Sequence, residues 1–201
     1  IEGYRHFINK LWNAARFALM HVADGAPDMP LSEAAKAGLC HAMILSRLER
    51  LKLTVSGAID GYQFNEAAQE LYGFFWREFC DWYLEMAKVD LGGDDPVKKG
   101  AAKRVLLTVL TETLTLMHPI IPFVTQEIWS KLPGITEPNL AKVPFPELRP
   151  ELISDAAESA MELLRAVVVG VRNIRAELNI NPGVKLTALV HTESAAEAAS
   201  L

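Results

Sequence analysis

The chain has 201 residues, of which 50% are hydrophobic and 22% are charged. These proportions are typical of a globular protein with a sizeable core, and they exclude a disordered chain. No run of about twenty apolar residues occurs, so we expect no membrane-spanning helix. The net charge of −5 argues against a general nucleic-acid coat, but residues 1–53 carry a net charge of +2. If an anionic partner binds, the first quarter of the chain is where the charge permits it.

The first predicted helix, 2–21, has two distinct faces. Apolar residues recur every three or four positions, at Tyr4, Phe7, Leu11, Ala15, Ala18 and Val22. A polar row with the same spacing lies on another face and consists of Arg5, Asn9, Asn13 and Arg16. Because Asn has a poorer helix propensity than Glu or Lys, this row indicates recognition of an unpaired base edge and a phosphate. The alternative is that the amides bond to a neighbouring helix or cap a loop, as most side-chain amides do.

Further helices follow along the chain. One is predicted from about Ser32 to Ser56, after a loop that contains glycine and proline. The next, 65–88, is aromatic nearly all round, which indicates burial on more than one side. A helix from Pro96 to Met117 starts with proline at a favoured first position, and a short helix is predicted over 123–132.

The last third of the chain changes character. Five prolines within 133–150 predict an extended connector. A long helix is predicted over 155–178, and the alternation of apolar and polar residues over 185–191 predicts one strand. Its partner strand is expected in a continuation of the chain, which begins without Met and is interpreted as a piece of a longer protein. We therefore predict a helical domain over 1–150 and the start of a small α/β subdomain over 151–201.

Motifs for catalysis are missing from the sequence. It contains no glycine-rich phosphate loop, no nucleophile elbow and no His-Glu-x-x-His motif. Cys40 and Cys80 both lie in helical patterns, which fits a reducing cytosol and not a disulfide framework. Cys40 and His41 lack a second ligand pair at a suitable spacing, so no metal site is expected. The residues alone therefore predict a helix-rich recognition or scaffold domain.

Four segments resemble the anticodon-binding domain of class I aminoacyl-tRNA synthetases of the bacterial valyl type. The segments are 2–17, with its Asn-Lys-Leu-Trp-Asn-Ala-Ala-Arg-Phe run, 79–85, 117–129 and 171–180. They occur in the order found in that family, and the resemblance covers nearly the whole chain. It implies a mainly α fold: a helical bundle of the class I anticodon-binding type with a small C-terminal α/β appendage.

The resemblance also implies a function. The parent enzyme would be cytoplasmic and would use ATP to charge tRNA(Val) with valine. Its active site would precede Ile1, and its editing domain would also lie outside this chain. We therefore expect no catalytic residue and no cofactor in this chain, and the chain alone is expected to be inactive. Its partners would be the anticodon stem-loop of tRNA(Val) and the catalytic domain of the same polypeptide. The alternatives are the anticodon domain of an isoleucyl enzyme and a non-enzymatic helical scaffold that binds proteins.

The resemblance assigns RNA binding to Asn9, Asn13, Arg16, Phe17 and Met43. The two amides would contact base edges, Arg16 would hold a phosphate or a base, and Phe17 would support or stack. Where Met43 stands, the family usually has an aromatic residue, and a thioether offers a base only a soft contact. Met43 therefore either contacts a base in this limited way or packs inward, in which case base contact depends more on the first helix.

Overall fold

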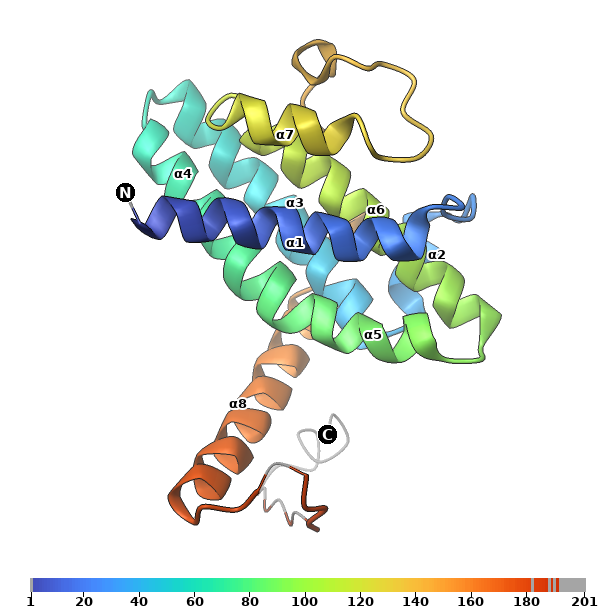
Figure 1. Cartoon of the computed structure of the whole chain (residues 1–201), viewed down its shortest axis with the longest axis vertical. Coiled ribbons are helices and arrows are strands. Elements are labelled where there is room, and N and C mark those ends of the chain that lie inside the picture. The colour runs from blue at the N-terminus through green and yellow to red at the C-terminus, as the bar shows by residue number, and fades with distance from the viewer. Residues whose placement is uncertain (1, 182, 188, 190, 192–201) are drawn as a thin grey trace. The chain divides into compact units, whose positions relative to one another are not determined.

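The computed structural model describes residues 2–181, 183–187, 189 and 191 (Figure 1). The chain divides into two compact units, Ile1–Ser154 and Asp155–Leu201, which are described separately below. Every regular element in the described residues is a helix. In chain order these are α1 (Glu2–Val22), α2 (Leu31–Lys36), α3 (Leu39–Asp60), α4 (Phe64–Gly73), η1 (Phe74–Tyr83), α5 (Leu84–Gly92), α6 (Pro96–Met117), α7 (Pro122–Trp129), η2 (Leu140–Lys142), η3 (Pro150–Leu152) and α8 (Asp155–Glu177).

Three of the predicted helices are confirmed nearly residue for residue: α1, α6 and α8. Pro96 is the first residue of α6, and the Asp95 carboxylate caps this helix by accepting hydrogen bonds from the backbone N–H groups of Val97 and Lys98. The single helix predicted over 32–56 is wrong, because the segment forms two helices, α2 and α3. They separate at Gly38, whose extended backbone, with φ −175° and ψ 148°, interrupts the helix.

The aromatic segment predicted as one α-helix over 65–88 contains a ten-residue π-helix, η1. The backbone N–H of Leu84 accordingly bonds to the carbonyl oxygen of Phe79, five residues earlier. Phe75, Phe79 and Tyr83 are fully buried along η1, and their rings form a continuous tilted and stacked series. We infer that the wider turn accommodates these large side chains on the buried side of the helix.

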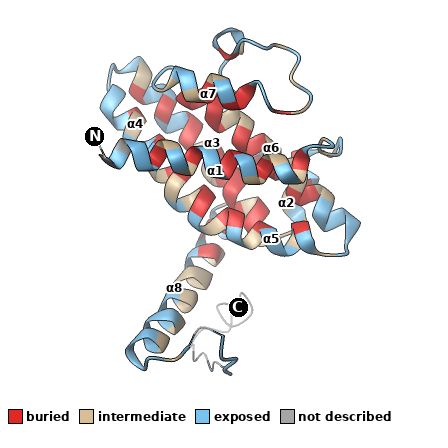
Figure 2. Cartoon of the chain, in the orientation of Figure 1, coloured by how far each residue is buried: buried red, intermediate tan, exposed pale blue. Residues whose placement is uncertain are grey.

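The core of the first unit lies around α3 and α6 (Figure 2). α3 contacts α2, α4, η1 and α6, and α1 packs against α6, α7 and η1. The inward positions of α1 match the predicted apolar stripe: Phe7, Leu11, Ala15, Ala18 and Val22 are all buried. Figure 1 shows α1 crossing the front of this bundle, so the opposite face of α1 is left on the surface.

A buried ionic network joins α3, α6 and the connector that follows α7. Glu49 is fully buried and accepts hydrogen bonds from the backbone N–H of Arg149 at 2.8 Å and from its guanidinium at 2.9 Å. Lys52 donates to Glu49 at 2.7 Å and lies 2.8 Å from Glu112, while the Arg149 guanidinium also donates to Glu112 at 2.6 Å. Both carboxylates therefore have two cationic partners, which compensates the cost of removing them from water.

The second unit consists of α8 and the turn after it. Arg175, in the last turn of α8, donates hydrogen bonds to the carbonyl oxygens of Asn181 at 2.5 Å and Val184 at 3.0 Å. No strand is found at the described positions of the predicted strand, 185–187, 189 and 191, and the remaining positions lie outside the described residues. Among the described helices, none combines the length and the hydropathy that crossing a membrane requires.

The ionic network generates a prediction about stability. Glu49→Ala should lower the free energy of unfolding by about 3–5 kcal/mol, because it leaves the buried Lys52 ammonium with one carboxylate partner fewer. Urea denaturation measures the difference. Glu85→Ala is the matched control, since Glu85 pairs with Lys88 on an exposed surface and its loss should cost less than about 1 kcal/mol. Equal losses in the two variants would contradict the role given to Glu49.

Candidate nucleic-acid interface

The polar row of α1 lies on the surface of the first unit. Asn9, Asn13 and Arg16 are all exposed, because a straight helix that buries its apolar stripe turns the residues at these positions outward. Because Asn9 and Asn13 are exposed, their amides are not sealed against a neighbouring helix, as the alternative had predicted. Asn9, Asn13 and Arg16 therefore present two amide groups and one guanidinium to solvent within two turns of helix.

An aromatic pair stands beside this row. Tyr72, at the end of α4, and Trp76, in η1, stack with ring centroids 5.5 Å apart and ring planes 21° from parallel. Tyr72 is 40% exposed, and its other neighbour is the buried ring of Phe7, 5.0 Å away. The pair thus rests on the core at one side and remains partly open to solvent.

Lys10 connects α1 to the aromatic pair. Its ammonium nitrogen lies 4.0 Å from the centroid of the Trp76 ring and 2.5 Å from a carboxylate oxygen of Asp81. The first contact is a cation–π interaction, and the second is a salt bridge that is largely exposed to solvent. Together they join α1 to η1 at the middle of the polar row.

Asn9 and Asn13 of the polar row and the aromatic pair border one open hollow of about 620 Å³. We call it the Asn9 hollow. Its walls are Gly3, His6, Asn9, Lys10 and Asn13 from α1, and Tyr72 and Trp76 from the opposite side. Amides that donate and accept hydrogen bonds, an ammonium group and aromatic rings are the groups that hold an unstacked nucleotide.

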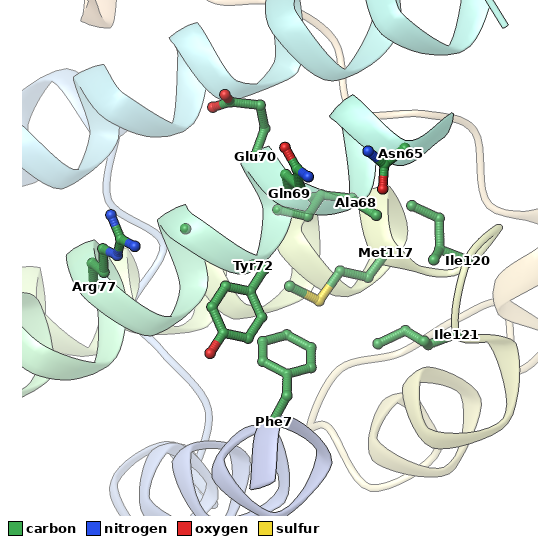
Figure 3. A pocket seen from close by; sticks show the side chains of 12 residues that line it. Phe7, Asn65, Ala68, Gln69, Glu70, Tyr72, Arg77, Met117, Ile120 and Ile121 are labelled. Atoms are coloured by element: carbon green, nitrogen blue, oxygen red, sulfur yellow. The ribbon is translucent and has the colours of Figure 1, made fainter. Parts of the chain in front are cut away.

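Tyr72 also lines a second pocket (Figure 3). It measures about 610 Å³ and is mainly apolar. In Figure 3 the side chains of Phe7, Tyr72, Met117 and Ile121 gather around it, while the amide of Asn65 lies at its rim. Tyr72 therefore lines both the Asn9 hollow and this apolar pocket.

Phe17 lies one turn further along α1 and does not line the Asn9 hollow. Its half-buried ring packs against the His21 ring at a centroid distance of 4.6 Å, and the Lys88 ammonium lies 5.7 Å from its centroid. Burial, followed by the charges of Lys103 and Lys99, lowers the pKa of His21, so the ring beside Phe17 is neutral at pH 7. This environment agrees better with a supporting role for Phe17 than with a fully exposed stacking surface.

Met43 does not belong to this surface. It lies on the buried side of α3 with 1% of its area exposed. A base at the surface cannot reach its thioether, so the assignment of Met43 to RNA binding is replaced by the packing alternative. The aromatic surface comes from Tyr72 and Trp76, which belong to the segment 65–88 that the sequence analysis predicted to be buried on more than one side.

The comparisons with known proteins agree with this arrangement. Residues 41–190 match a family described as the anticodon-binding domain of tRNA ligase. The valine–tRNA ligase of Nitratidesulfovibrio vulgaris is 50% identical over 100% of this chain, that of Desulfotalea psychrophila 48% over 94%, and that of Syntrophotalea carbinolica 44% over 98%. The chain spans 22% of the length of each of these relatives.

The family match begins after α1, whereas the similarity to the Nitratidesulfovibrio vulgaris protein extends over the whole chain and so includes α1. The bundle and the helix that carries the polar row are therefore both similar to parts of tRNA ligases. From the match over 41–190, the chain belongs to the family of anticodon-binding domains of tRNA ligases.

Proposed function

We propose that this chain is the anticodon-binding part of a valine–tRNA ligase and that the Asn9 hollow holds the unstacked anticodon of tRNA(Val). One observation carries the proposal: the polar row of α1 is exposed beside an open aromatic pair, within a domain of the anticodon-binding family. The identity of 50% to a valine–tRNA ligase over the whole chain supports valine as the amino acid.

The proposed binding mode follows from the chemistry of the hollow. The amides of Asn9 and Asn13 both donate and accept hydrogen bonds, so each can pair with the edge of an unstacked base. If the Lys10 ammonium moves from the Trp76 ring to a phosphate, that ring face becomes available to a base, and such stacking contributes about 1–3 kcal/mol per base. Arg16, beyond the hollow along the same row, is placed to neutralise a phosphate.

The contribution of the chain to the reaction is positioning. By holding the anticodon loop, it would direct the acceptor end of the tRNA to an active site elsewhere in the ligase. That active site would use ATP to activate valine, and the rest of the ligase polypeptide is the other proposed partner of this domain. The chain alone is expected to bind RNA without charging it, and the proposed compartment is the cytoplasm.

Arg16→Ala tests the contact to tRNA in the full-length ligase that contains this chain. We expect tRNA(Val) binding to weaken by about 1–3 kcal/mol, because one guanidinium contact is lost. Valine activation, measured as pyrophosphate exchange without tRNA, should stay unchanged. Lys131→Ala is the control, since Lys131 is exposed outside the hollow and pairs with Glu127. Unchanged tRNA charging kinetics in the Arg16 variant would count against the proposal.

Trp76→Ala tests the aromatic pair, using the anticodon stem-loop RNA and fluorescence anisotropy. Binding should weaken by about 1–3 kcal/mol, and Trp76→Phe should retain most of the affinity because it preserves a ring face. Phe123→Ala is the control, since Phe123 is a 91% exposed aromatic residue on α7 that does not line the hollow. Equal affinities for the Trp76→Ala and Phe123→Ala variants would show that the pair does not stack on RNA.

The alternatives make different predictions in the same experiments. Binding of the stem-loop should weaken steeply with added salt, because phosphate contacts release counterions. A complete lack of binding at low salt would instead favour a scaffold that binds proteins. Preferential charging of tRNA(Ile) by the full-length ligase would still support the anticodon role, but it would assign isoleucine and not valine as the amino acid of the ligase.

A further inference from the structure

A cluster of polar side chains lies buried in the first unit, away from the Asn9 hollow. Cys40 and His41 belong to the first turn of α3, Tyr83 ends η1, and Asp90 comes from α5. One potential ligand atom each from Cys40, His41 and Asp90 falls within 4.8 Å of the other two. Asp90 lies about fifty residues after Cys40 and His41 in the sequence, so the spacing of residues along the chain did not reveal it as a third potential ligand.

The His41 ring is the centre of this cluster. Its Nδ1 lies 3.2 Å from the Tyr83 hydroxyl, and its Nε2 lies 3.2 Å from Oδ2 of Asp90. Although His41 is fully buried, its Nε2 has no hydrogen bond of suitable geometry. The two groups therefore lie at ion-pair distance in a geometry unsuited to an N–H···O hydrogen bond, and an ion held between them would explain this arrangement.

We propose that Cys40, His41 and Asp90 form a zinc-binding site. Zn²⁺ takes sulfur, imidazole nitrogen and carboxylate oxygen ligands in a tetrahedron, with bonds of about 2.0–2.3 Å. In such a tetrahedron a nitrogen and an oxygen ligand lie about 3.3 Å apart. The 3.2 Å between Nε2 of His41 and Oδ2 of Asp90 matches this spacing. The Cys40 sulfur lies 3.9 Å from Nδ1 of His41, and its side chain would turn toward Nε2 to complete the set.

The surroundings fit a metal bound by three protein ligands and one water. If Nδ1–H of His41 donates to the Tyr83 hydroxyl, the lone pair of Nε2 is left for the metal, as in many zinc sites where a second partner orients the imidazole. Gly38 leaves space beside the ligands: a Cβ there would stand 3.8 Å from Nε2 and 3.9 Å from Oδ2. The Asp90 side chain is 18% exposed, which gives an ion a path into the cluster.

Binding would be coupled to loss of a proton. Burial, followed by the charge of Asp90, raises the pKa of the Cys40 thiol to about 11, so without metal the thiol is protonated at pH 7. When sulfur coordinates Zn²⁺, the S–H bond breaks, the sulfur keeps the electron pair, and the proton leaves to solvent. The bound metal would then link the start of α3 to α5.

Co²⁺ is the probe for this site, because it occupies zinc sites and gives a thiolate charge-transfer band in the near ultraviolet. The 201-residue chain, reduced and freed of metal with a chelator, should bind one Co²⁺ with this band, and Zn²⁺ should abolish the band by displacement. Cys40→Ser should lose the band. Cys80→Ser is the matched control and should keep it, since Cys80 is a second buried thiol outside the cluster.

Two further measurements keep the test independent of folding defects. Asp90→Asn changes a partly exposed ligand without removing volume, and it should weaken Co²⁺ binding at least about tenfold while circular dichroism stays unchanged. Zn²⁺ should raise the melting temperature of the unmodified chain and of Cys80→Ser, but not that of Cys40→Ser. Absence of the band in the unmodified chain, its persistence in Cys40→Ser, or equal zinc stabilisation of all variants would overturn the proposal.

Discussion

Burial of one stripe of α1 is the constraint on which the candidate interface depends. Leu11, Ala15 and Ala18 pack into the bundle with almost no exposed area. Because a helix is rigid, burying this face fixes the direction in which the opposite face points. Asn9 and Asn13 are therefore held on the surface by apolar contacts on the far side of the same helix. Among the described residues no polar group is seen to hold the Asn9 and Asn13 side chains, so they are available to a partner.

The second half of the interface depends on a different feature, the helix formed by α4 and η1. The π-helical segment buries Phe75 and Phe79 in the core, while Tyr72 and Trp76 remain at the edge that faces α1. Lys10 lies over one of these rings and connects the two helices. Large aromatic side chains thus serve both the core and the surface from one continuous segment, and the surface rings are supported from beneath by core rings.

The extent to which the sequence predicts this structure follows from the range of the interactions involved. The limits of α1 and its two faces depend on spacing along one helix, so periodicity alone predicted them. The break at Gly38 and the burial of Met43 depend on packing between helices, and no local pattern reveals them. Tyr72 and Trp76 are spaced four residues apart, a signal for one shared helix face, but their proximity to α1 is visible only once the bundle is formed.

The central claim is that the exposed amides of α1 contact an unstacked anticodon, and side-chain NMR of the isotope-labelled chain tests it most directly. The account predicts that the anticodon stem-loop of tRNA(Val) shifts the side-chain amide signals of Asn9 and Asn13 and the indole N–H signal of Trp76. A stem-loop of unrelated sequence should shift them less. Saturable binding of the cognate stem-loop that leaves these three signals unmoved, while signals elsewhere in the bundle shift, would contradict it.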